Sequence, residues 1–202
     1  MPVPPCVSSL AHSSHISWPH LPFMNLVLIG YRGSGKTAVA RALAERLGWP
    51  WYDADEAVER LAGKSIAQIF AEDGEPAFRN WEAQVVDELS ARPDCILALG
   101  GGAVLSGANR AAIARQGQVA WLTASPETLW RRIQADATTA ARRPNLTIAG
   151  GITEIIATLA ARAPLYRQCA HVVVDTEQRT PAEIADAILA ECRLTPTSRD
   201  GA

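Results

Sequence analysis

The strongest chemical signal in the chain is an eight-residue stretch, Gly30-Tyr31-Arg32-Gly33-Ser34-Gly35-Lys36-Thr37. It matches the pattern G-x-x-x-x-G-K-[ST] at every fixed position. Glycines at these places let backbone N–H groups curl around phosphate oxygens, and the helix expected from Lys36 onward directs its positive dipole end at the same anion. In this pattern Lys36 reaches the β- and γ-phosphates of a nucleotide, and the Thr37 hydroxyl ligates Mg²⁺.

Two observations narrow the class of phosphate-loop protein. Of the 19 basic residues only Lys36 and Lys64 are lysines, and neither follows an asparagine, so the Asn-Lys-x-Asp signature of GTPases is absent. Motor and transport ATPases need far more than 202 residues. A small-molecule kinase is therefore the leading class, with ATP and Mg²⁺ as cofactors. The expected ATP contacts in the loop are Gly33, Ser34, Gly35, Lys36, Thr37 and Ala38.

Acidic residues and glycines mark the ends of two further expected strands. Asp53-Ala54-Asp55 follows an apolar stretch, and alternate side chains of an extended segment point to opposite sides. One carboxylate is then expected to face the metal and the other the substrate. The alternative is that Asp55 caps a helix, a common role of aspartate. Gly100-Gly101-Gly102 follows the next strand and predicts a close approach of the backbone to a ligand, or else a loose turn.

These residues need a scaffold in which strands alternate with helices. Apolar runs predict five strands, at 26–29, 49–52, 95–99, 119–122 and 171–175. Periodicity and capping residues predict helices at 36–47, 65–70, from 76, from 126, at 152–163 and at 181–192. Ser65 with Gln68, and Thr180 with Glu183, form capping boxes, while Pro164 is expected to end the helix before it. The alternation predicts an α/β fold, a three-layer sandwich with a parallel sheet that binds ligands at the carboxyl ends of its strands.

Charge and composition exclude several other classes. The net charge is −2 at pH 7, without the basic excess of a nucleic-acid-binding protein. Four scattered cysteines form no zinc motif and no disulfide-dense pattern, and no apolar run approaches the roughly 18 residues of a membrane span. We therefore expect a cytoplasmic protein that binds neither nucleic acid nor membranes. We also expect it to act as a monomer, although composition does not bear on the oligomeric state.

The folded domain is expected to span 24–192, with a tail at each end and a lid within it. Residues 1–23 hold five prolines and five serines but no charged side chain, which predicts a disordered N-terminal tail. Translation from Met24 is an alternative explanation of this segment. Residues 134–151 are polar, end in Gly150-Gly151 and predict a lid, and residues 193–202 predict a C-terminal tail.

The order of the motifs along the chain resembles the shikimate kinase family. After the phosphate loop and Asp53-x-Asp55 come Ser65-Ile66-x-x-Ile69-Phe70, Phe78-Arg79-x-x-Glu82, the triple glycine, Arg143-Pro144 and Arg162-Ala163-Pro164-Leu165-Tyr166. The resemblance implies a fold like that of nucleoside monophosphate kinases, with a five-stranded parallel sheet, a substrate-binding region and a mobile lid. It also implies transfer of the ATP γ-phosphoryl group to the 3-hydroxyl of shikimate, in aromatic amino-acid biosynthesis.

The resemblance also implies roles for individual residues. The implied shikimate-binding residues are Asp55, Arg79, Gly101, Gly102 and Arg162. The implied metal site is formed by Thr37 and Asp53. The implied catalytic residues are Lys36, Asp55 and Arg143, with Arg143 reaching from the lid over both substrates and Arg142 as its alternative. Arg132 and Arg179 are implied near the adenine end. The chemistry agrees, because an arginine fork binds a carboxylate such as that of shikimate through two parallel hydrogen bonds.

Alternatives remain at the level of the residue and of the protein. Arg79 has Glu75 and Glu82 at helical spacing, which would also suit a surface ion pair, and Arg162 lies in the last turn of an expected helix, where a cation is favoured. A kinase for gluconate or a nucleoside monophosphate is a second function. A kinase-derived regulatory protein without turnover is a third, although Lys36, Asp55 and Arg79 are all present.

Overall fold

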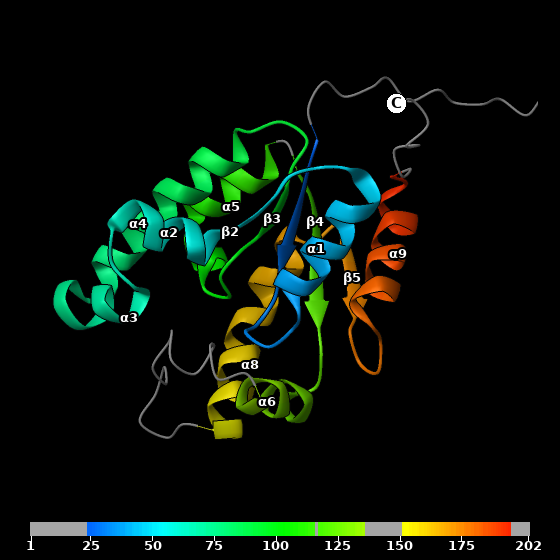
Figure 1. Ribbon diagram of the computed structural model, residues 1–202. Coiled ribbons are helices and arrows are strands. Elements are labelled where there is room, and N and C mark those ends of the chain that lie inside the picture. Colours follow the sequence, from blue (N-terminus) through cyan, green and yellow to red (C-terminus); the bar gives the residue numbers. More distant parts are fainter. Residues whose placement is uncertain (1–23, 116, 136–150, 195–202) are drawn as a thin grey trace, which may run out of the picture.

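The computed structural model describes residues 24–115, 117–135 and 151–194. In these ranges five strands form one parallel sheet in the order β2-β3-β1-β4-β5 (Figure 1). The strands are β1 (Asn25–Ile29), β2 (Trp51–Asp53), β3 (Ile96–Ala98), β4 (Gly117–Thr123) and β5 (Val172–Asp175). The predicted α/β fold with a parallel sheet is therefore confirmed. Strand β1 lies at the centre of the sheet, with β3 and β2 on one side and β4 and β5 on the other.

Helices cover both faces of this sheet (Figure 1). They are α1 (Lys36–Leu47), α2 (Ala54–Ala62), α3 (Ile66–Gln68), a π-helical turn (Ile69–Asp73), α4 (Gly74–Ser90), a 3₁₀ turn (Ala103–Leu105), α5 (Gly107–Ala114), α6 (Pro126–Ala135), α8 (Gly151–Cys169) and α9 (Pro181–Cys192). Alternate residues of β1 take part in different clusters. Leu26 and Leu28 pack with residues of α1 and α9, whereas Val27 and Ile29 pack with residues of α2, α4 and α5. The result is the expected three-layer arrangement, because a parallel sheet buries both of its faces.

Local capping signals in the sequence are confirmed. Ser65 with Gln68 caps α3 and Thr180 with Glu183 caps α9, each through a reciprocal pair of side-chain and backbone hydrogen bonds. Helix α1 ends at Gly48, whose φ of 69° is a left-handed conformation that favours glycine. Asp175 accepts a hydrogen bond from the backbone N–H of Glu177, as expected of a turn residue.

Three expectations about elements are wrong. Helix α8 continues through Pro164 to Cys169, because the residues beyond the proline are held by packing: Tyr166 is fully buried and stacks on Trp121 with ring centroids 5.5 Å apart. Strand β2 begins at Trp51 rather than at residue 49. The helix expected at 65–70 is instead the short α3 followed by a π-helical turn. The sequence indicates α2 only through the capping alternative at Asp55, and it does not predict α5.

The segments expected outside the core are described only in part. Residues 1–23, 136–150 and 195–202 lie outside the described residues. At the margins of the expected lid, Gln134 and Ala135 complete α6, and Gly151 begins α8. Within the described ranges, the structure contains no helix that combines the length and the apolar character needed to cross a membrane.

Candidate active site

The candidate residues lie where the parallel strands end, as the fold class predicts. Strand β1 runs directly into the phosphate loop, β2 ends at Asp53, and β3 leads through Leu99 into the three glycines. Leu28 of β1 and Asp53 of β2 are both paired with Ala98 of β3, so these three strands end at nearly the same level. The register of the sheet therefore brings together residues that are far apart in the sequence.

The phosphate loop is a glycine-dependent turn held by its own lysine. Gly30 has a φ of 143°, and a Cβ atom there would lie 2.5 Å from the carbonyl oxygen of Leu122, so only glycine fits without a shift of the backbone. The ammonium nitrogen Nζ of Lys36 donates to the carbonyl oxygens of Gly30 and Tyr31, each at 2.9 Å. The lysine thus already points into the loop that it is predicted to serve, where a phosphate would sit.

Thr37 and Asp53 meet at the start of α1, which supports their predicted pairing as a metal site. The Thr37 hydroxyl donates to Oδ2 of Asp53 at 2.7 Å. Mg²⁺ is commonly held by one or two protein oxygens together with substrate phosphates rather than by a cage of side chains. The donor set beside the phosphate loop therefore fits Mg²⁺ bound with a nucleotide.

The extended geometry expected for Asp53-Ala54-Asp55 is wrong. Helix α2 begins at Ala54, and Asp53 is its N-cap, with Oδ1 accepting from the backbone N–H of Asp55 at 3.0 Å. The helix-capping alternative is thus correct in kind, but the capping residue is Asp53 rather than Asp55. Asp55 lies in the first turn of α2, half-buried, and its part in the reaction stays a prediction.

Arg79 lies over the turn formed by the glycines. Its guanidinium donates to Oε1 of Glu75 and to Oε2 of Glu82, each at 2.8 Å, and Glu82 is buried. A Cβ atom on Gly102 would come within 2.6 Å of Nη1 of Arg79. Burial disfavours the charged guanidinium, but the attraction and hydrogen bonds of Glu82 and then Glu75 outweigh it and raise the pKa of Arg79. The group is therefore a permanent cation held in one place.

The ion pairs expected from the spacing of Glu75, Arg79 and Glu82 are formed, and the role of Arg79 in binding shikimate stays a prediction. Only 23% of the Arg79 side chain is exposed, so the pairing with Glu82 is not the loose contact of a surface helix. The glycines are buried, which makes the loose-turn explanation wrong. The close approach that they allow is, in this structure, an approach of protein groups: Arg79 at Gly102, and the carbonyl oxygen of Gly30 at Gly101.

A second arginine reaches the same turn from helix α8. Nη1 of Arg162 donates to the carbonyl oxygen of Gly101 at 3.0 Å, and the Tyr166 hydroxyl donates to the same oxygen. The guanidinium groups of Arg79 and Arg162 therefore both contact the Gly101–Gly102 turn, although they come from helices on different parts of the chain. Two cations at one buried turn form a suitable place for a carboxylate.

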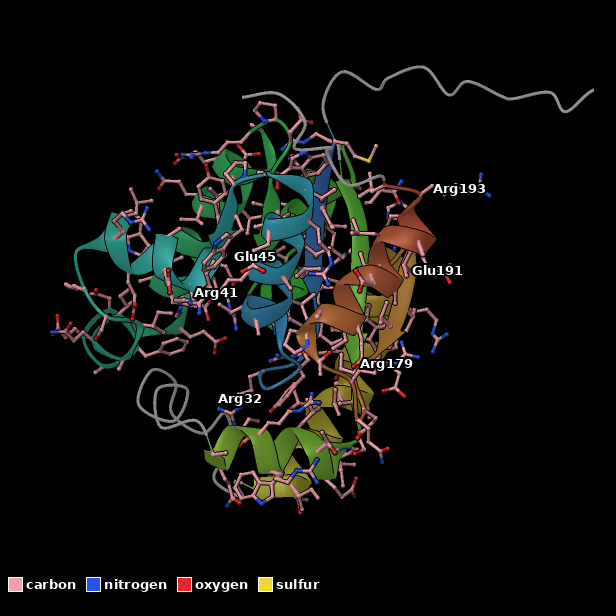
Figure 2. All side chains as sticks on the ribbon, turned by 45° about the vertical axis from the view of Figure 1, so that its right-hand side comes forward. Arg32, Arg41, Glu45, Arg179, Glu191 and Arg193 are labelled. Atoms are coloured by element: carbon pink, nitrogen blue, oxygen red, sulfur yellow. The ribbon has the colours of Figure 1, made fainter. Side chains whose placement is uncertain are left out.

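The two arginines expected near adenine differ in their surroundings. Arg132 donates to Thr176 through Nη1 to the hydroxyl at 2.9 Å and through Nη2 to the carbonyl oxygen at 2.7 Å, and it lies 3.5 Å from the carbonyl oxygen of Gly33 in the phosphate loop. Arg179 is exposed in the connection between β5 and α9 (Figure 2). Arg142 and Arg143 lie outside the described residues, so the predicted role of the lid arginine is not described by the structure.

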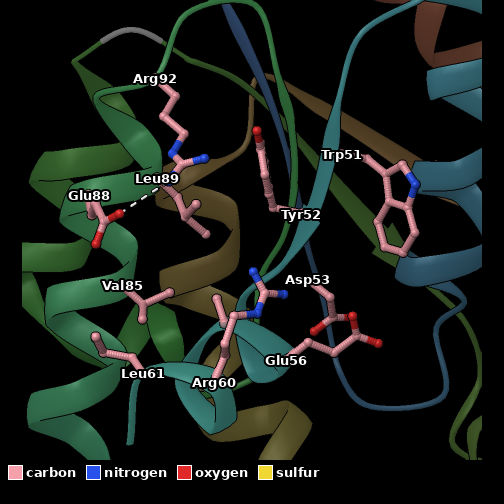
Figure 3. A pocket seen from close by; sticks show the side chains of 11 residues that line it. Trp51, Tyr52, Asp53, Glu56, Arg60, Leu61, Val85, Glu88, Leu89 and Arg92 are labelled. Atoms are coloured by element: carbon pink, nitrogen blue, oxygen red, sulfur yellow. Dashed lines mark hydrogen bonds and ion pairs between the residues drawn. The ribbon is translucent and has the colours of Figure 1, made fainter.

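A hollow of about 430 Å³ adjoins the site on the outer side of edge strand β2 (Figure 3). Asp53 and Glu56 lie at one end of it, Arg92 and Tyr52 lie toward the other, and apolar side chains of α2 and α4 form a wall. Its lining includes neither Lys36 nor the two arginines at the glycine turn. This hollow is thus a neighbour of the candidate metal site and not the place where Arg79 and Arg162 meet.

Comparison with known proteins bears directly on this geometry. The family model described as "Shikimate kinase" matches residues 32–193. The chain belongs to the shikimate kinase family. The shikimate kinase of Symbiobacterium thermophilum is 46% identical over 166 residues, which cover 82% of this chain and 94% of that protein. The shikimate kinase of Rhodopirellula baltica is 45% identical over 165 residues, covering 82% and 88%.

Solved structures agree with the family assignment. A shikimate kinase from Acinetobacter baumannii, solved in complex with shikimate, superposes with a TM-score of 0.78 at 36% identity, covering 84% of this chain and 92% of that one. The resemblance inferred from the motifs and the fold expected of a shikimate kinase are thus confirmed. The roles of single residues remain predictions, because family membership does not test them.

Residues that the motif analysis did not assign also contact the site of this shikimate kinase family member. Arg32, at a variable position of the phosphate loop, donates through Nη2 to Oε1 of Glu154 at 3.0 Å. The Thr176 hydroxyl accepts a hydrogen bond from Arg132 and donates one to the carbonyl oxygen of Thr123, at 2.9 Å. The position of Arg32 within the loop was the one available signal, since no local pattern links residues 122 positions apart.

Proposed function

We propose that this chain transfers the γ-phosphoryl group of ATP to the 3-hydroxyl of shikimate, giving shikimate 3-phosphate and ADP. The observation that carries the proposal is the meeting of two kinds of groups at one end of the sheet. Lys36, Thr37 and Asp53 form a nucleotide and metal side, and Arg79 and Arg162 form a cationic pair around Gly101–Gly102. Gly101 adjoins the carbonyl oxygen of Gly30, so the two sides are in contact.

The nucleotide side provides positioning and positive charge, which are the main needs of phosphoryl transfer. The loop's backbone N–H groups and the N-terminus of α1 hold the β- and γ-phosphates, and Lys36 exchanges its carbonyl partners for phosphate oxygens. Thr37 and Asp53 would hold Mg²⁺, which would neutralise part of the phosphate charge when bound. Arg132 lies beside Gly33, where it supports the loop toward the adenine end.

The acid side of the site, formed by Arg79 and Arg162 around Gly101–Gly102, binds and orients the shikimate acid. Arg79 and Arg162 bind the substrate carboxylate through paired hydrogen bonds, and the permanent charge of Arg79 makes this binding insensitive to pH in the neutral range. Asp55 hydrogen-bonds the ring hydroxyls and accepts the proton of the attacking 3-hydroxyl. Arg143 reaches over both substrates from the lid and stabilises the charge that develops on the transferred group.

The proposal includes the setting of the enzyme: a monomer in the cytoplasm that supplies chorismate biosynthesis. The described cysteines, Cys95, Cys169 and Cys192, are unpaired thiols, which suits a reducing compartment.

The deciding experiment measures ADP release by the purified chain with Mg·ATP, alone and with shikimate, gluconate or a nucleoside monophosphate. We expect strong stimulation by shikimate only. Arg162→Ala is expected to raise the KM for shikimate at least about tenfold, because a charged hydrogen bond to the acid is lost. Arg115→Ala is the matched control, since Arg115 is 61% exposed and pairs with Asp87 on the surface.

The other outcomes each replace part of the proposal. Stimulation by gluconate or a nucleotide instead of shikimate would keep the kinase and reject the carboxylate role of the two arginines. Binding of ATP without turnover for any acceptor would favour a regulatory protein. An unchanged shikimate KM in Arg162→Ala would remove Arg162 from the substrate site.

A further inference from the structure

Three of the eight residues of the phosphate loop are glycines, which do little to restrict its conformation. Gly30, Gly33 and Gly35 all have positive φ angles, of 143°, 80° and 88°. Glycine loses more conformational freedom on ordering than other residues, so a glycine-rich loop needs contacts from outside to keep one shape. The contacts of Lys36 with the carbonyl oxygens of Gly30 and Tyr31 are not a permanent restraint, because the same ammonium group serves the phosphates.

Arg32 is the loop residue with an ion pair to a distant helix. Its Nη2 donates to Oε1 of Glu154 in the first turn of α8, and the exposed fractions of the two side chains are 13% and 0%. Figure 2 shows Arg32 at the end of the sheet where α6 and α8 lie below the phosphate loop. Because the pair is shielded from water, it is far less weakened by solvent than a surface ion pair.

The neighbouring side chains fix the geometry of this ion pair. Tyr31, the residue before Arg32, is 2% exposed and packs in one apolar cluster with Leu129 and Ile133 of α6 and Ile155 of α8. Ile155 follows Glu154, so adjacent residues of the loop meet adjacent residues of the helix. The Nε atom of Arg32 is buried without a hydrogen-bond partner. The guanidinium group is therefore held in place by its hydrogen bond to Glu154.

Helix α8 is also attached to the acid side of the site. Two turns beyond Glu154 it carries Arg162, and then Tyr166, both of which donate to the carbonyl oxygen of Gly101. These bonds do not involve Arg32. Loss of the ion pair would therefore remove the polar link between the phosphate loop and α8, while α8 keeps its hold on the Gly101 turn.

We propose that Glu154 is a positioning residue for phosphoryl transfer: its buried carboxylate anchors Arg32 and so holds the phosphate loop in its nucleotide-binding shape against α8. It touches neither ATP nor shikimate. The inference deepens the proposed function, on which it rests, by naming what keeps the nucleotide side of the site organised. It separates nucleotide binding, which depends on Glu154, from binding of the acid, which depends on Arg79 and Arg162.

The positioning role and simple charge attraction predict opposite changes in nucleotide affinity when the charge of Glu154 is removed, so the direction of the change tests the proposal. Removal of a negative charge near an anion site, with Arg32 freed to face the phosphates, strengthens the binding of an anionic nucleotide by simple Coulomb attraction. If Glu154 acts by positioning, its neutral analogue must weaken that binding. Glu154→Gln keeps the size of the side chain and removes its charge.

The experiment measures the Kd of Mg·ADP by calorimetry, without substrate, for the whole chain and for Glu154→Gln, Arg32→Lys and the double variant. We expect about tenfold weaker binding in each single variant, since one charged hydrogen bond is lost. The Kd of Mg·ADP for the double variant is expected to be no higher than the higher of the two single-variant values, because both changes remove the same interaction. The KM for ATP is expected to rise more than kcat falls, and the shikimate KM to stay within about twofold. Asp87→Asn, which removes the exposed pair with Arg115, is the control and leaves the Kd unchanged.

Tighter or unchanged Mg·ADP binding in a folded Glu154→Gln variant overturns the proposal, and so do independent, additive effects of the two single variants. If Glu154→Gln does not fold, Arg32→Lys keeps both charges and decides the question: unchanged Mg·ADP affinity in that variant rejects the positioning role. Because the measurement uses ADP alone, failure of shikimate as a substrate would reject the proposed function without altering this result.

Discussion

The position of Arg79 depends on an atom that its neighbour lacks. Gly102 has an ordinary backbone conformation, with a φ of −98°, so no turn geometry demands glycine there. Its requirement comes from the guanidinium group of Arg79, which occupies the volume where a Cβ would lie. Glu75 and Glu82 then hold that group from the other side. The glycine thus leaves room for the guanidinium group of Arg79, which is the group proposed to bind the acid.

Gly102→Ala should therefore impair substrate binding and leave the fold intact. The new methyl group would lie 2.6 Å from Nη1 of Arg79, at the end of a flexible side chain that can move away at little cost. We expect the KM for shikimate to rise about tenfold, by loss of a charged hydrogen bond, with a melting temperature close to that of the parent. Gly107→Ala is the control, because its Cβ would be 3.6 Å from the nearest atom. A Gly102→Ala enzyme with unchanged shikimate KM would show that Arg79 does not bind the acid.

Lys36→Ala tests the charge at the phosphates. We expect kcat to fall about 10²- to 10³-fold, because a preorganised charge that acts on the transition state is removed. Lys64→Ala is a natural control, since Lys64 is the other lysine of the chain and pairs on the surface with Glu72 and Asp73. Steady-state kinetics with both substrates provides the measurement. A kcat within threefold of the parent for Lys36→Ala would remove the lysine from catalysis.

The residues that could be predicted are those whose signal is local. Lys36, Thr37 and Asp53 follow from short spacings, and the structure brings them together. Glu154 could not be found in this way, because its partner Arg32 lies 122 residues away and only the fold joins them. The place of Arg79 beside Gly102 could not be predicted for the same reason, because only the fold brings these two residues together.

At the scale of elements, tertiary contacts decided the cases where local rules failed. A proline inside a helix removes a hydrogen bond and crowds the preceding turn, which is why Pro164 predicted an end to α8. The helix continues because Tyr166 and the residues around it pack into the core and bind Gly101. By contrast, both capping boxes were predictable, since each is complete within four residues.

Helix α6 depends on a carboxylate from another connection, and this makes its stability sensitive to acid. Glu177 accepts from the backbone N–H of Ser125 at 2.7 Å and from the Thr128 hydroxyl at 2.9 Å. The backbone hydrogen bond, followed by those of the Ser125 and Thr128 side chains, lowers the pKa of Glu177. Because the folded-state pKa lies below the unfolded value of about 4.3, the contribution is complete above that pH and is lost as pH falls through the folded pKa.

The measurement is the melting temperature from pH 7 to pH 3 for the parent and for Glu177→Gln. We expect the variant to be less stable at pH 7 and to approach the parent as the pH falls through the lowered folded-state pKa of Glu177, where the carboxylate of the parent becomes protonated. Glu191→Gln, at the exposed end of α9, is expected to follow the parent throughout. A constant difference between Glu177→Gln and the parent at every pH would contradict a role for the ionised carboxylate.

The whole molecule is organised around a sheet that the two larger apolar clusters share. Leu26 and Leu28 belong to the cluster under α1 and α9, while Val27 and Ile29 of the same strand belong to the cluster under α2, α4 and α5. Neither cluster survives without β1, so the two sides of the sheet should unfold together. Far-ultraviolet and near-ultraviolet circular dichroism are expected to give one coincident transition.

Residues 1–23 should contribute nothing to that transition. Strand β1 begins at Asn25, and Met24 is bound through its backbone N–H to Oδ1 of Asp94 at 3.3 Å, so the described fold is anchored from its first residues. A chain that starts at Met24 keeps every contact described for the sheet and the site. We expect its melting temperature to lie within about 2 °C of the full chain, as for a change remote from the core, and its kcat and both KM values to be unchanged. A clear loss of stability would show that the first 23 residues pack against the domain, and a changed KM with unchanged stability would place them at the site.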